Sequence, residues 1–175
     1  MYYGVDRFVI LLGLLKSPGY NYFTQNGSFF RFFTYSVLHA SFLHYALNML
    51  NFWLIYKVLL KYKTNNTLIE LVYILSITIG GLAQLHFSSR PELSIIGASG
   101  GVFGLYGMML AHYFIKKDWS SFLISIFIDG FFNVFLVLQV PNIGWIAHLA
   151  GVIIGFSFGL LFIPSKKIKK IYHGK

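Results

Sequence analysis

Five long apolar segments, each separated from the next by a short polar break, constrain this chain more than any other feature. A membrane-crossing helix needs about 20 apolar residues to cover roughly 30 Å of hydrocarbon. Backbone groups in lipid must find hydrogen bonds within their own segment, so such segments are expected to be helices. The sequence therefore predicts an all-α, polytopic transmembrane helical bundle. The expected spans are residues 36–60, 67–85, 95–115, 122–140 and 143–163.

The composition excludes most alternatives to a membrane bundle. Of 175 residues, 57% are hydrophobic and 11% are charged, against roughly 45–50% and about 25% in soluble domains. The length leaves room for one bundle, so we expect a single domain over residues 1–165 and a basic tail over residues 166–175. The short apolar run Phe8–Leu15 is too short to cross a bilayer, and we expect it to be interfacial or re-entrant. The chain has no cysteine, so disulfides and thiolate chemistry are excluded.

The positive charge predicts membrane topology rather than nucleic-acid binding. The net charge is +9, but the lysines lie in the connections between apolar segments and in the C-terminal tail, as the positive-inside rule expects of cytoplasmic regions. We therefore expect a multi-pass protein of the plasma membrane with a cytoplasmic C-terminus, with the lipid bilayer and not nucleic acid as a partner. Beyond the tail, the lysines expected on the cytoplasmic side are Lys57, Lys61, Lys63, Lys116 and Lys117.

Polar side chains inside the first expected span form a stripe. His44, Asn48 and Asn51 are spaced by four and three residues, which places them on one face of a helix. Polar groups in a bilayer are costly, so this face must contact other helices. His39 lies five residues before His44, and on a continuous helix it would be rotated away from the stripe. The simpler interpretation of His39 is a hydrogen-bonded surface or capping residue.

A serine lies among glycines at the start of the third span. Closely spaced small residues allow helices to pack tightly. Such packing explains the glycines within residues 97–101 and Gly104. It does not explain Ser99, which would lie beside the unpaired N–H groups of a helix N-terminus, where an anion can be held. Ser99 is therefore a candidate nucleophile as well as a packing residue.

The last span places a histidine on a glycine-lined face. Gly151 and Gly155 follow His148 by three and seven residues, so all three share one side of the helix. Such a histidine can meet a neighbouring backbone closely, as a general base must, although a structural hydrogen bond or a proton relay would also explain it. Because alternate spans run in the same direction, Ser99, His148 and His44 are all expected in the outer half of the membrane.

Taken together, these motifs resemble the rhomboid family of intramembrane serine proteases. The resemblance extends from about Phe30 to the end of the last span, and it depends on the order and spacing of several short motifs on separate spans. Those motifs are Arg31, the His39, His44 and Asn48 pattern, Gly97-Ala98-Ser99-Gly100, and Ala147-His148 followed by Gly151 and Gly155.

The resemblance implies a Ser–His dyad without a third carboxylate. Ser99 would be the nucleophile and His148 the base, while His44, Asn48 and the Ser99 backbone N–H would stabilise the oxyanion. Phe103 would stack on the catalytic histidine. No metal or other cofactor is implied. The residues expected to support packing are Gly97, Gly100, Gly104, Gly151, Gly155 and Arg31.

The sequence departs from the family pattern at three places. Phe103 stands where the family usually has a tyrosine, and Phe30 stands where it usually has a tryptophan before the loop arginine. Residues 8–33 look like the family's first external loop, which would place its first span upstream of Met1.

The function expected from this resemblance is an intramembrane serine endopeptidase. It would cleave membrane-anchored proteins near the outer boundary of their transmembrane segments. One alternative is a catalytically inactive relative that binds transmembrane helices as a chaperone or adaptor. Another is a small channel or proton-coupled transporter. This alternative is less favoured, because the sequence shows neither the inverted repeat nor the paired broken helices of such transporters. The natural substrate, the cleavage sequence and the oligomeric state stay open at this stage.

Overall fold

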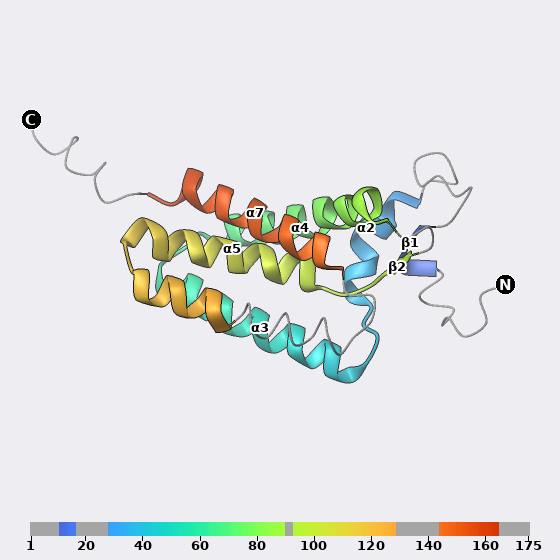
Figure 1. The fold of residues 1–175 in the computed structure, drawn as a ribbon, viewed down its shortest axis with the longest axis horizontal. Coiled ribbons are helices and arrows are strands. Elements are labelled where there is room, and N and C mark those ends of the chain that lie inside the picture. Colours follow the sequence, from blue (N-terminus) through green and yellow to red (C-terminus); the bar gives the residue numbers. More distant parts are fainter. Residues whose placement is uncertain (1–10, 17–27, 90–92, 129–143, 165–175) are drawn as a thin grey trace, which may run out of the picture.

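The computed structural model describes residues 11–16, 28–89, 93–128 and 144–164, and within these the chain is mainly helical (Figure 1). The long helices are α3 (Phe42–Lys61), α4 (Asn66–Phe87), α5 (Ser99–Lys116) and α7 (Trp145–Phe162). A further helix covers Trp119–Ile128. Before α3 lie the short helical pieces η1 (Ser28–Phe30), α2 (Arg31–Thr34) and η2 (Tyr35–Val37), and two strands, β1 (Leu14–Lys16) and β2 (Leu93–Ile95), form one small sheet.

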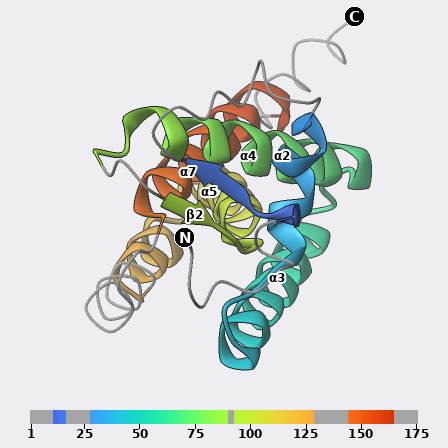
Figure 2. The same ribbon diagram turned by 90° about the vertical axis from the view of Figure 1, so that its right-hand side faces the viewer.

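Helix α5 is the centre of the described bundle. Viewed end-on, it lies among α3, α4 and α7 (Figure 2), and Leu105 and Met108 on it are fully buried. Its glycines explain how close α7 can come. A Cβ added at Gly155 would overlap the carbonyl oxygen of Gly104, and one added at Gly151 would overlap that of Gly100. The two backbones are therefore in contact where small residues face each other.

The small sheet joins the N-terminal segment to the residues before α5. Strands β1 and β2 pair antiparallel, with Leu14 opposite Ile95. Leu14 is fully buried in a cluster that includes Tyr35 and Ile77. The other regular elements of the described chain are helical, so the predicted helical fold class is supported, and this small sheet, which includes the end of Phe8–Leu15, is an addition that the prediction did not contain. Residues 8–10 of that run lie outside the described part of the chain.

Two expected spans begin later than the sequence suggested. Helix α3 begins at Phe42 rather than residue 36, because Ser41 caps it: the Ser41 side chain accepts the N–H of His44 at 3.1 Å. Helix α5 begins at Ser99 rather than residue 95, because Ile95 pairs in β2 and Gly97 has φ +118°.

The other helices follow the prediction more closely. Helices α4 and α7 match the expected spans 67–85 and 143–163 to within two residues at each end. Of the span expected at 122–140, residues 122–128 are helical, and the remainder lies outside the described residues.

Two helices in the described ranges are both long and apolar enough to cross a membrane. They are α4, with mean hydropathy 1.8, and α7, with 1.9. Helices α3 and α5 have 20 and 18 residues, but the polar stripe of the first and the glycines of the second lower their hydropathy. Length and composition therefore support two of the five predicted spans, and the other three stay predictions.

Candidate active site

Ser99 and His148 meet at the same end of two adjacent helices. Ser99 is the first residue of α5, and His148 lies in the first turn of α7. The Ser99 Oγ and the His148 Nε2 are 2.8 Å apart, a hydrogen bond between side chains 49 positions apart in sequence. The close glycine contact between α5 and α7 allows this short distance, because both side chains start from backbones that nearly touch.

The ring of His148 is held on one face by Phe103. The two rings are stacked, with centroids 4.3 Å apart and planes tilted by 16°. Phe103 lies one turn after Ser99 on α5, so the nucleophile candidate and the stacking ring share one face of the helix. The phenylalanine therefore makes the ring contact expected at this position without the hydroxyl of a tyrosine.

The start of α7 is held by Gln84, a residue that the sequence analysis did not select. The Gln84 Oε1 accepts the backbone N–H of Ile146 at 3.0 Å and that of Ala147 at 3.2 Å. Gln84 is buried, and Gly144, the N-cap residue of α7, provides no side-chain cap. The amide of α4 thus satisfies two N–H groups of the first turn of α7, next to His148. The signal in the sequence that could have identified Gln84 is a side-chain amide within an apolar span.

The loop before Ser99 requires a glycine. Gly97 has φ +118°, a conformation that side chains rarely adopt. Its N–H donates to the carbonyl oxygen of Tyr35 at 2.9 Å, and a Cβ at this position would lie 2.9 Å from the ring of His44. Gly97 therefore both turns the chain into α5 and leaves room for His44 beside the loop.

His44 and Asn48 lie on α3, one turn apart. The ring of His44 faces Gly97, which brings it to the loop that precedes Ser99. Asn48 is buried, and its Nδ2 donates to the carbonyl oxygen of His44 at 2.9 Å. Within the described residues no hydrogen bond joins either side chain directly to Ser99 or His148.

His39 lies closer to the site than the sequence analysis expected. Because α3 begins at Phe42, His39 is not on the helix, and its ring packs edge-on against His44 with centroids 5.0 Å apart. The expectation that it points away from the stripe is wrong for this reason. Its Nδ1 is 3.3 Å from the carbonyl oxygen of Val37, so the expected hydrogen bond to the local backbone is present.

Arg31 and Tyr35 connect the segment before α3 to the rest of the molecule. The Arg31 Nη1 donates to the carbonyl oxygen of Gly13 at 3.2 Å. The Tyr35 hydroxyl donates to the carbonyl oxygen of Ile77 at 2.5 Å, while the Tyr35 carbonyl accepts from Gly97. Tyr35, which the sequence analysis did not select, thus links α4 to the loop before Ser99.

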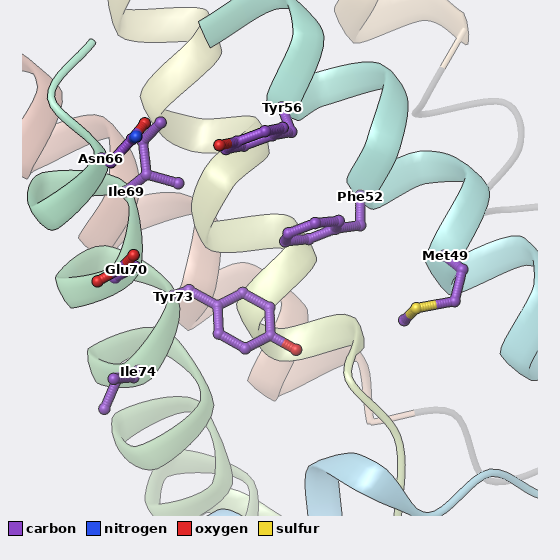
Figure 3. Close-up of a pocket in the computed structure, with 8 residues that line it drawn as sticks. All are labelled: Met49, Phe52, Tyr56, Asn66, Ile69, Glu70, Tyr73 and Ile74. Atoms are coloured by element: carbon purple, nitrogen blue, oxygen red, sulfur yellow. The ribbon is translucent and has the colours of Figure 1, made fainter. Parts of the chain in front are cut away.

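An apolar hollow of about 590 Å³ lies between α3 and α4 (Figure 3), and neither Ser99 nor His148 lines it. Phe52 and Tyr56 line it from α3, and Glu70 and Tyr73 line it from α4. None of its lining residues is one of the predicted site residues. Within the described chain, no three His, Cys, Asp or Glu residues are grouped as metal ligands.

The described residues thus bring together a hydrogen-bonded serine and histidine on two glycine-packed helices of an apolar bundle, the arrangement that a serine nucleophile and its base would need. The model of the Rhomboid domain family matches residues 26–165. The chain therefore belongs to the rhomboid family, and the predicted family and class of serine-type protease are confirmed.

Curated relatives of the chain are named as rhomboid proteases. The chain is 29% identical to a putative rhomboid protease of Bacillus subtilis, YdcA, over 95% of this chain and 84% of that protein. It is also 29% identical to rhomboid-type serine protease B of Aspergillus fumigatus, over 85% of this chain and 59% of that protein. It is 26% identical to rhomboid protease GlpG of Haemophilus influenzae, over 89% and 79% of the two chains.

Proposed function

We propose that the chain is an intramembrane serine endopeptidase in which Ser99 and His148 form a catalytic dyad. The observation that carries this proposal is the 2.8 Å hydrogen bond between the Ser99 Oγ and the His148 Nε2. A serine hydroxyl is a weak nucleophile unless a base within hydrogen-bond reach takes its proton. Membership of the rhomboid family supports the same assignment.

The proposed reaction proceeds in two steps. As the Ser99 Oγ attacks the scissile carbonyl carbon, the His148 Nε2 takes the hydroxyl proton, and it then gives this proton to the leaving amine when the C–N bond breaks. In the second step a water loses a proton to His148 and attacks the acyl-enzyme, and the proton returns to Ser99 as the ester bond breaks. In place of an orienting carboxylate, the Phe103 stack and the Gln84 contact to α7 hold the histidine.

The oxyanion would be stabilised from two sides. The N–H of Ser99 is among the first N–H groups of α5, which have no partner within the helix. His44 adjoins the loop that precedes Ser99, and the second N–H of the Asn48 amide is a further donor on α3, the helix of His44. Removing one such donor in comparable sites lowers kcat about 10²–10³-fold.

The substrate would be a membrane-anchored protein cleaved near the outer boundary of its transmembrane segment. Ser99 and His148 lie near one end of their helices rather than in the middle, and the predicted topology makes this the outer end. A helical substrate hides its peptide bonds in hydrogen bonds, so local unwinding is needed. Small or helix-breaking residues near the cleaved bond would therefore favour cleavage.

The test combines active-site labelling with cleavage of a reporter. Purified protein is treated with a serine-reactive fluorophosphonate, and cleavage of a single-span reporter is measured in liposomes. Ser99→Ala and His148→Ala are each expected to abolish both signals. Ser157→Ala and His86→Ala, which alter exposed residues of α7 and α4, are the matched controls and should retain both.

The alternative of an inactive helix-binding relative gives a different result. Folded wild-type protein that is not labelled and does not cleave the reporter, yet binds a transmembrane peptide, would refute the protease proposal. Labelling that persists in Ser99→Ala would refute the assignment of the nucleophile.

A further inference from the structure

Lysines gather at the end of the bundle opposite the small sheet. In Figure 1, α3 and α5 both end on the side away from β1 and β2, and the lysines lie in the last turns of these helices and directly after them. The acidic residues in the described part of the chain are Glu70 and Asp118, so positive charge dominates this end. The five exposed lysines, defined here as the lysine surface, are Lys57, Lys61, Lys63, Lys116 and Lys117.

Contacts between α3, α5 and the turn after α3 hold this surface together. The ring of Tyr62 stacks on that of His112, with centroids 4.8 Å apart, and the Lys116 Nζ lies 4.6 Å from the centroid of the Tyr62 ring. The Thr64 Oγ1 is 2.7 Å from the Nε2 of the buried His112. The turn that carries Lys63 is therefore fixed to α5, and the other four lysines lie on α3, on α5 or directly after α5.

Two of the lysines occupy positions that favour glycine. Lys63 and Lys117 both have φ 57°, and each follows the C-terminus of a long helix. Glycine is the usual residue in such a left-handed position, because a Cβ there is unfavourable. A lysine at both positions thus carries a backbone cost that glycine would not.

We propose that the lysine surface binds the headgroups of anionic phospholipids. The surface lies at the ends of helices whose sides carry exposed apolar residues, which is the level of the headgroups when such helices cross a bilayer. The half-exposed Trp119 flanks the surface, as expected of a side chain at a membrane interface. Clustered lysines next to a membrane attract anionic lipids.

The test uses tryptophan fluorescence and brominated lipids. A variant with Trp53→Phe and Trp145→Phe has Trp119 as its one tryptophan. It is placed in phosphatidylcholine bilayers of two kinds, one with a fraction of brominated phosphatidylglycerol and one with the same fraction of brominated phosphatidylcholine. Quenching is expected to be several-fold stronger with brominated phosphatidylglycerol, and the preference should fall in high salt. A variant that retains only Trp145, at the opposite end of the bundle, should show no preference.

Glycine variants separate charge from folding. Lys63→Gly with Lys117→Gly removes two charges and also relieves the backbone conformation, so the protein should fold at least as stably as wild type. The lipid preference should fall, by up to about fivefold for each lysine removed, whereas Lys63→Arg with Lys117→Arg should retain it. Equal quenching by the two lipids in the parent protein would overturn the proposal, as would an unchanged preference in the folded glycine variant.

Discussion

Replacing Gln84 by methionine is expected to slow the reaction of Ser99, although the hydrogen bonds of Gln84 go to the backbone of α7 and not to Ser99. Methionine retains the length and volume of glutamine but removes the carbonyl that accepts the N–H groups of Ile146 and Ala147. Both N–H groups lie within two residues of His148, so the first turn of α7 loses its anchor to α4 at the point where the proposed base begins.

The expected magnitude follows from the two bonds and from the site geometry. Net contributions of about 0.6 kcal/mol per bond in membrane proteins and about 0.5–1.5 kcal/mol in soluble ones give a total loss of stability of about 1–3 kcal/mol. The domain should still fold. The effect on the reaction is larger, because a misplacement of about 1 Å in a catalytic group can cost about 100-fold. We expect labelling of Ser99 by a fluorophosphonate to slow about 10–100-fold.

The assay measures the labelling rate and the melting temperature of the same preparations. Thr78→Val is the matched control, since it removes another side-chain hydrogen bond of α4, from the Thr78 Oγ1 to the Ile74 carbonyl at 2.9 Å, away from α7. Gln84→Glu retains an acceptor next to a helix N-terminus, which favours negative charge, and should recover much of the rate. A folded Gln84→Met protein that is labelled at the wild-type rate would refute the positioning role.

Three further predictions concern packing, the histidine stack and pH. Gly155→Ala places a Cβ on a carbonyl oxygen of α5 and should lower the stability measured in thermal unfolding by about 1–3 kcal/mol. Gly144→Ala is the control and should change stability little, because its Cβ would meet its neighbours at 3.5 Å or more. Phe103→Tyr should retain the labelling rate and Phe103→Leu should lower it, because the second removes the ring stacked on the histidine. Hydrogen bonds from Ser121 lower the pKa of Asp118 in the folded protein. The ionised carboxylate therefore stabilises the fold, and the melting temperature of wild type should exceed that of Asp118→Ala by a constant amount near neutral pH and by less as the pH falls below about 4. A constant difference down to pH 2 would contradict this account.

Two local patterns made Ser99 and His148 candidates in the sequence, and the resemblance to the rhomboid family joined them as a pair. Apolar runs of fixed length set the direction of each helix, and the glycines after His148 and around Ser99 set which helix faces can approach. The ends of α4 and α7 agree with the prediction because polar or helix-breaking residues follow the apolar runs.

Contacts between distant parts of the chain were not predictable in the same way. Leu14 and Leu15 of β1 end a continuously apolar run, and the partner strand lies far along the sequence, so local periodicity does not indicate the pairing. The late start of α3 depends on the Ser41 cap, and the position of His39 beside His44 follows from that start. Nothing in the sequence distinguishes Tyr35 from the many other aromatic residues, and its role is evident only from its two backbone partners in the structure.

The distance between Ser99 and His148 is therefore a consequence of backbone packing more than of the two side chains. A Cβ at Gly151 would overlap the carbonyl oxygen of Gly100, one residue after Ser99. Any side chain there would push α7 away from α5, and a histidine three residues earlier would move with it. Gln84 fixes the same turn of α7 from the side of α4. The glycines set how near the helices come, the amide sets where α7 begins, and the short hydrogen bond between serine and histidine requires both.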